Sequence, residues 1–229
     1  MSNQFDGFSA DTLAFYSEIV ENNNKAWFEE NKLRFKAIQK LAQAFVVAMG
    51  EALHALDDTI HFNTKLTGSG SIFRIYRDTR FSKDKTPYKT NLAMTWWAGE
   101  NKKATMSSFY FSLSADGGYF GCGHYQFEKH VMEAYREAVA NELRGAMLAD
   151  AIADITGAGY ELHGAKYKRV PRGYDKEHPY GELLKHKGIF VGGAEVDKEL
   201  LTSAELIPAC LKHARAMLPL HSWLTQIEH

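Results

Sequence analysis

Residues 107–125 read SSFYFSLSADGGYFGCGHY, and this stretch decides the fold class. Two segments rich in aromatic residues, 107–113 and 119–125, are separated by ADGG, a sequence typical of a turn between strands. A third segment of the same kind, YKTNLAMTWW at 88–97, is followed by the turn signal AGEN. Because the connections are short, we expect the three segments to pair as antiparallel strands.

Helical sequence lies on both sides of these strands. Ser9 is a suitable N-cap for a first helix, and the three asparagines at 22–24 break that helix and offer a cap for the next one. Apolar residues then recur at steps of three and four from about 25 to 56, in a helix long enough to bend or break once. Further helices are expected at 128–140, at 143–155 and from about 203 onward.

Weaker strand patterns at 71–76, 160–165 and 188–191 complete the order of elements, whereas 77–87 and 166–178 are expected to be loops. Helices on both sides of a run of strands favour an α+β fold over a parallel βαβ array. No linker and no repeat divides the chain. We therefore predict one α+β domain over residues 1–229, with its core at about 8–224. In it, a mostly antiparallel central sheet is packed by N-terminal and C-terminal helices.

The composition is that of an ordinary globular protein, because 45% of the 229 residues are hydrophobic and 24% are charged, which excludes global disorder. No apolar run reaches the roughly 18 residues needed to span a bilayer, and residues 1–6 do not resemble a signal peptide. Two cysteines, Cys122 and Cys210, are too few for a disulfide-stapled fold or a cysteine-rich zinc module. We expect a soluble, cytoplasmic protein with no membrane partner. Its oligomeric state is left open.

The net charge of −1 conceals two basic segments. Residues 72–90 contain six basic and two acidic residues, and residues 166–172 contain four basic residues and no acidic one. These 26 positions carry a net charge of +8, whereas the other 203 positions carry −9. Concentrated positive charge on an otherwise acidic chain favours a local anionic partner.

Four stretches of the sequence carry a family resemblance. They are FRIYRDTRFSKDKTPYKT at 73–90, NNNKAWF at 22–28, GCGHY at 121–125 and RVPRGY at 169–174. Together they resemble the signature of a bacterial and fungal family of uncharacterised proteins, domain-of-unknown-function family 2461, over roughly residues 8–224. The resemblance implies a compact α+β domain. It implies no reaction, because the family is not assigned one.

The first basic segment has two interpretations. In one, its side chains surround a phosphate or carboxylate group, for which the planar guanidinium of arginine is well suited. In the other, Asp78 and Asp84 neutralise some of the arginines in a structural salt-bridge network, which leaves a surplus of four positive charges unexplained. Under the first interpretation the ligand-binding residues are Arg74, Arg77, Arg80, Lys83, Lys85, Tyr88 and Lys89.

The second basic segment, 166–174, could form another wall of the same anion site through Lys168, Arg169 and Arg172, or could be an ordinary exposed loop. The central hypothesis is that the two basic segments meet in space. His124 follows a Gly-Cys-Gly sequence that permits close approach of a ligand, and it is a candidate general base near this site. Cys122 is better explained as a small residue packed in the sheet.

These residues predict no metal site and no cofactor. Asp78 and Asp84 are flanked by basic residues that oppose a cation, and no pair of histidines has a zinc-binding spacing. The function that the sequence favours is binding of a small phosphate- or carboxylate-bearing ligand in a basic cleft, with enzymatic activity left open. Two alternatives remain. One is a nucleic-acid-associated protein, which the acidic remainder of the chain disfavours, and the other is a module that docks an acidic protein partner.

Overall fold

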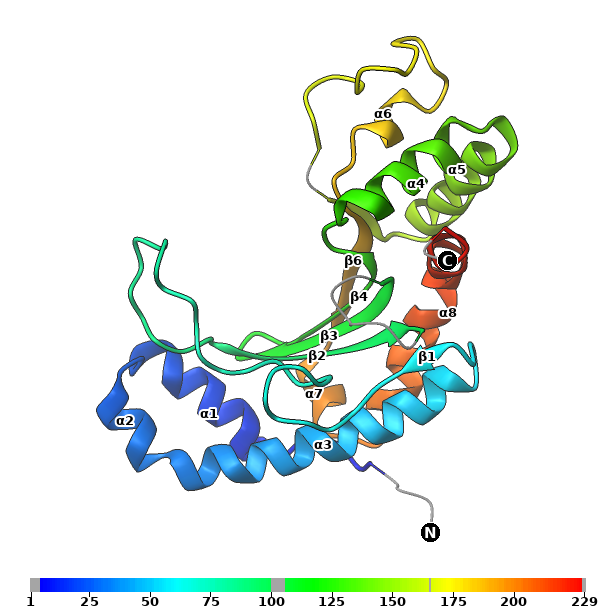
Figure 1. The fold of residues 1–229 in the computed structure, drawn as a ribbon. Helices are drawn as coiled ribbons and strands as arrows, with labels where there is room; N and C mark the ends of the chain where they lie inside the picture. The colour runs from blue at the N-terminus through cyan, green and yellow to red at the C-terminus, as the bar shows by residue number, and fades with distance from the viewer. Residues whose placement is uncertain (1–4, 100–105, 165, 228–229) are drawn as a thin grey trace. The chain divides into compact units, whose positions relative to one another are not determined.

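The computed structural model describes residues 5–99, 106–164 and 166–227. Over these residues the chain forms helices and one antiparallel sheet, so the predicted α+β class is confirmed (Figure 1). The described helices are α1 (Ala10–Glu21), α2 (Lys25–Glu30), α3 (Lys32–His54), α4 (Lys129–Ala140), α5 (Glu142–Gly157), α6 (Gly181–Leu184), α7 (Lys198–Leu201) and α8 (Leu206–Thr225). The described strands are β1 (Ile60–His61), β2 (Asn91–Ala98), β3 (Ser108–Ser114), β4 (Gly118–His124), β5 (Glu161–His163) and β6 (Ile189–Val196).

The N-terminal helices begin and end where the sequence predicts. The Ser9 side chain accepts a hydrogen bond from the Thr12 amide, and the Asn24 side chain accepts one from the Trp27 amide. These caps satisfy amides that a helix start leaves without partners. The expected long helix breaks once, at Asn31 between α2 and α3.

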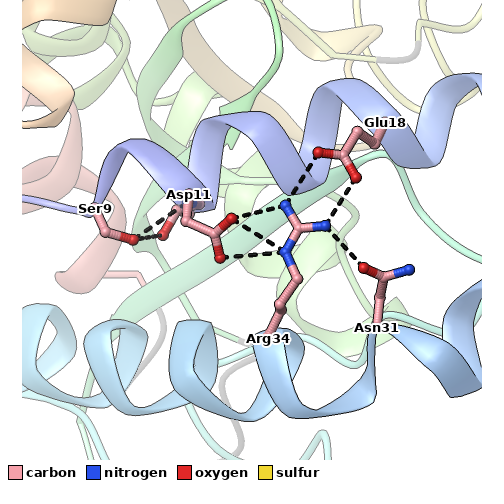
Figure 2. Close-up of polar contacts among 6 residues, drawn as sticks. Ser9, Asp11, Glu18, Asn31 and Arg34 are labelled. Atoms are coloured by element: carbon pink, nitrogen blue, oxygen red, sulfur yellow. Dashed lines mark hydrogen bonds and ion pairs between the residues drawn. The ribbon is translucent and has the colours of Figure 1, made fainter.

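A charged cluster joins α1 to α3. The Arg34 guanidinium of α3 donates hydrogen bonds to the carboxylates of Asp11 and Glu18 on α1, with closest distances of 2.7 and 2.8 Å (Figure 2). Arg34 also donates to the Asn31 side chain at 2.8 Å. These contacts raise the pKa of Arg34 and lower that of Glu18, because each charged form is stabilised by the other. The cluster fixes two helices that are separated by the short α2.

The sheet has the strand order β1-β2-β3-β4-β6-β5. Strand β3 alternates buried and half-buried residues, so only one of its faces enters a core. Residues 71–76 do not form the expected strand. Residues 71–73 lie beside β2 through the Ile72–Met94 bridge and two backbone hydrogen bonds. By Tyr76 the segment has left β2 and bridges Tyr88 instead, so it has no single partner strand along its length.

The chain divides into two compact units. Unit 1 comprises residues 1–96, 110–120 and 195–211, and unit 2 comprises residues 97–109, 121–194 and 212–229. The single domain expected over residues 1–229 stays a prediction. The two units are interleaved along the chain, because strands β2, β3, β4 and β6 each contribute residues to both units.

The core of unit 1 lies between α3 and the sheet. The rings of Phe45 and Phe111 are 4.9 Å apart, and the buried Trp96 indole donates a 2.9 Å hydrogen bond to the carbonyl of Val46. Phe8 packs on the same side, with its ring centroid 5.3 Å from that of Phe45. Aromatic burial of this kind holds the helical layer against β2 and β3.

Unit 2 has a second core built on α4, α5 and the end of α8. The buried Tyr135 of α4 packs against Phe127 and Trp223, and its hydroxyl donates to the carbonyl of Leu183 at 3.0 Å. The Trp223 indole donates to the carbonyl of Arg144 at 2.9 Å. Among the residues that the structure describes, no helix combines the length and the apolar composition needed to cross a bilayer.

Candidate functional site

The first basic segment is folded as a hairpin, residues 72–90, which we call the basic hairpin. Its two sides are joined by the Tyr76–Tyr88 bridge and by two backbone hydrogen bonds. The Arg77 amide donates to the carbonyl of Pro87 at 2.9 Å, and the Lys89 amide donates to the carbonyl of Ile75 at 2.7 Å. The expected loop at 77–87 is therefore the tip of this hairpin.

The N-terminal helices hold the base of the hairpin. The Asn23 side chain donates to the carbonyl of Tyr88 at 2.9 Å and accepts from the amide of Tyr88 at 3.0 Å, as a neighbouring strand would. The Tyr88 ring stacks on Phe28 of α2, with centroids 4.2 Å apart. Tyr88, expected to bind ligand, is 4% exposed and serves as this anchor. Sequence spacing did not reveal Asn23, because its partner lies 65 residues away.

Two of the arginines are neutralised inside the hairpin. Arg77 pairs with Asp84 at 2.5 Å and also donates to the carbonyl of Thr86 at 3.2 Å. Arg80 pairs with Asp78 at 2.6 Å. Hydrogen bonds from the Thr86 amide and from Arg77 lower the pKa of Asp84 to about 2, and those from Arg80 lower the pKa of Asp78 to about 2. For these two arginines the structural interpretation is confirmed.

Four basic residues of the hairpin remain. Within the described part of the chain, Arg74, Lys83, Lys85 and Lys89 form no ion pair with a carboxylate. Lys83 and Lys85 are exposed near the tip, where the Lys85 ammonium donates to the carbonyl of Thr79 at 2.8 Å. The surplus of positive charge that the sequence indicated is thus located on these four side chains.

Lys89 and Arg74 make the most unusual part of this surplus. The Lys89 ammonium is half-buried and lies 5.4 Å from the centre of the Phe73 ring, which is 6.3 Å from the ring of Tyr110 on β3. Burial lowers the pKa of Lys89, and the nearby Arg74 guanidinium lowers it further. The Arg74 guanidinium is thus close enough to disfavour the charge on Lys89, and neither side chain forms an ion pair with a carboxylate among the described residues.

The second basic segment lies in unit 2, between β5 and α6 (Figure 1). It is an irregular loop, as expected, and the side chains of Lys168, Arg169 and Arg172 are exposed. Its start is held by the bridge between Lys166 and His186 and by a 2.7 Å hydrogen bond from the Tyr167 amide to the carbonyl of Lys185.

Two cations that the sequence did not single out lie against this loop. The Arg136 guanidinium of α4 is 5.3 Å from the centre of the Tyr167 ring, and the Lys187 ammonium is 4.5 Å from it. Arg136 stands on an ordinary amphipathic helix 31 positions before Tyr167, so nothing in its local pattern marks it.

A family model described as "Conserved hypothetical protein (DUF2461)" matches residues 11–223. The chain belongs to this family. The match includes all four motifs on which the resemblance was based, and the DUF2461 description assigns no activity. Neither the curated proteins nor the solved structures contain a match to the chain.

In this DUF2461 chain the candidate residues are divided between the two units. The basic hairpin belongs to unit 1, whereas His124, Lys168, Arg169 and Arg172 belong to unit 2, so the meeting of the two basic segments stays a prediction. His124 is 1% exposed and packs on Phe127, with ring centroids 4.7 Å apart. Within the described ranges, no group of three or more His, Cys, Asp and Glu side chains is arranged to hold a metal ion.

Proposed function

We propose that the protein binds a small phosphate- or carboxylate-bearing ligand through the basic hairpin. The observation that carries this proposal is the surplus of Arg74, Lys83, Lys85 and Lys89, which have no acidic partner among the described residues. Holding cations together costs electrostatic free energy, and an anion that binds between them recovers that cost.

Lys89 and Arg74 form the centre of the proposed site. Partial burial of Lys89 against Phe73 reduces its hydration, so an anion there interacts in a medium less polar than water. Arginine adds a planar pair of donors that suits the two oxygens of a phosphate or carboxylate. Lys83 and Lys85 would attract the anion from the tip of the hairpin.

Arg77 and Arg80 have a different task. Their pairs with Asp84 and Asp78 bend the tip into its observed shape, so they support the site without carrying surplus charge. The wider basic cleft, to which the sequence assigned Lys168, Arg169, Arg172 and His124 of unit 2, stays a prediction. That larger cleft, a cytoplasmic location and any enzymatic reaction remain parts of the proposal.

The test is a thermal-shift titration with inorganic phosphate, citrate and small phosphate esters. Ligand at about 100 times its Kd stabilises a protein by about 2.7 kcal/mol, a shift of roughly 5–11 °C for a chain of this size. The double variant Arg74→Gln/Lys89→Gln should lose most of that shift. The variant Lys40→Gln, which removes an exposed charge of α3, should keep it.

Two results would reject the proposal. One is the absence of stabilisation of the wild type by any of these anions, and the other is an equal response of the double variant. Arg77→Ala would be a poor probe, because it also breaks the hairpin. A single-stranded oligonucleotide that bound more tightly than the small anions, with an affinity falling linearly in log salt, would favour the nucleic-acid alternative.

A further inference from the structure

Unit 2 contains a cationic cluster of its own around Tyr167. Arg136 and Lys187 both lie within cation–π distance of this ring, which is 41% exposed. Lys187 directly follows the segment that pairs with the start of the basic loop, so the backbone bridge between Lys166 and His186 holds the two sides of the cluster together.

Arg136 shows that this cluster is incomplete by itself. Its Nε atom is buried and has no hydrogen-bond partner in the described structure. A buried donor without an acceptor costs about 1–3 kcal/mol, and more when the group is charged, so native structures rarely leave one unsatisfied. The ring of Tyr167 offsets part of the charge, but a ring face does not accept a hydrogen bond from Nε in the manner of an oxygen atom.

Two acidic residues on α4 and α6 are paired with other lysines. Glu182 pairs with Lys185, and Glu133 lies 3.9 Å from Lys129. Over the described ranges no ion pair involves Arg136, Lys166 or Lys187. His186 adds no positive charge near pH 7, because burial lowers its pKa to about 4 and leaves it neutral. The cluster therefore carries a surplus of positive charge, of which Glu182 offsets a part through its electrostatic interaction with Lys166.

We infer that Arg136, Lys187 and Tyr167 form an anion site within unit 2, and that its ligand is a phosphate monoester. Arg136 is only half-buried as a residue, and the terminal N–H groups of a guanidinium suit two phosphate oxygens, while the ammonium of Lys187 supplies a second full charge. A monoester carries −1.5 to −2 charges near pH 7, whereas a diester or a simple carboxylate carries one. Two cations therefore favour the monoester.

The inference concerns different residues from the proposed function and does not rest on it. Both can be measured by calorimetric titration with methyl phosphate, with dimethyl phosphate as the singly charged comparison. We expect the Arg74→Gln/Lys89→Gln variant to retain one equivalent of methyl phosphate. Adding Lys187→Met to that variant should reduce the remaining affinity at least 10-fold, and adding Arg136→Met should do the same.

Matched variants separate loss of charge from loss of fold. Lys187→Arg keeps the positive charge and should retain binding, and Lys40→Met, which removes an exposed lysine of α3, should leave it unchanged. Equal affinity for methyl and dimethyl phosphate would overturn the choice of a monoester. Binding that survives Lys187→Met and Arg136→Met would overturn the site itself. If the wild type bound only one equivalent of methyl phosphate, and both the Arg74→Gln/Lys89→Gln variant and the Arg136 or Lys187 variants lost it, a site belonging to unit 2 alone would also be overturned.

Discussion

Asn23 offers the sharpest test of how the basic hairpin is held. In Asn23→Ala, the Tyr88 amide and carbonyl both lose their side-chain partner, at 3.0 and 2.9 Å respectively. Each such bond contributes about 1 kcal/mol net, and Tyr88 is buried, so we expect a loss of about 2 kcal/mol. For a chain of this length that corresponds to a decrease in Tm of about 4–8 °C.

The assay is thermal unfolding followed by circular dichroism, with Asn22→Ala as the matched control. Asn22 makes one exposed hydrogen bond, from its side chain to the carbonyl of Glu18, so its removal should cost about 0.5 kcal/mol or less. Asn23→Asp should be at least as harmful as Asn23→Ala, because a carboxylate would face the Tyr88 carbonyl without a donor. Equal Tm values for Asn23→Ala and Asn22→Ala would refute the reasoning.

Arg34→Met should lower Tm by about 2–8 °C through loss of the α1–α3 contacts, worth about 1–2 kcal/mol, and differential scanning fluorimetry would measure it. Because Arg34 lowers the pKa of Glu18, that stabilisation is present above the usual carboxyl pKa, and the difference from wild type should shrink as pH falls below about 4. Gly123→Ala places a Cβ 2.4 Å from the Ile189 carbonyl oxygen at a φ of +140°, so urea denaturation should show a loss of about 3 kcal/mol or more. Gly159→Ala, at a φ of +95° in open space, should lose only about 1 kcal/mol. Burial lowers the pKa of His186 to about 4, so between pH 6.5 and 4 the unfolded chain binds a proton at this residue more readily than the folded chain. Stability should therefore fall as the pH is lowered from 6.5 to 4, and the urea midpoint should fall less for His186→Gln than for the wild type. An identical decrease would contradict this role.

Local signals in the sequence were reliable for this fold. The Ser9 and Asn24 caps and the ADGG turn involve neighbours within four positions, and short-range chemistry is enough to predict them. The strand expected at 71–76 failed because strand formation also depends on a partner along its whole length, and its partners change between Ile72 and Tyr76. Elements of two to four residues, such as β1, α6 and α7, are too short to produce a periodic pattern.

The candidate site was predictable as far as charge composition reaches. The surplus of four positive charges in the basic hairpin was visible in the sequence, and the structure shows with which arginines the two aspartates form ion pairs. Asn23, Arg136 and Lys187 were missed because their roles come from contacts with residues distant in sequence or on another element. Their own surroundings, an asparagine run, an amphipathic helix and a turn, have ordinary structural explanations.

The interleaved division of the chain has a consequence for how the protein is made. Unit 1 includes residues 195–211, which leave the ribosome only after residues 121–194 of unit 2 have been synthesised. Neither unit can therefore be completed while the first half of the chain is emerging, and strand β4 must wait for β6, its later neighbour in the sheet. The edge of β4 that later pairs with β6 is exposed during that interval, so translation of this chain creates a period in which chaperone binding competes with aggregation.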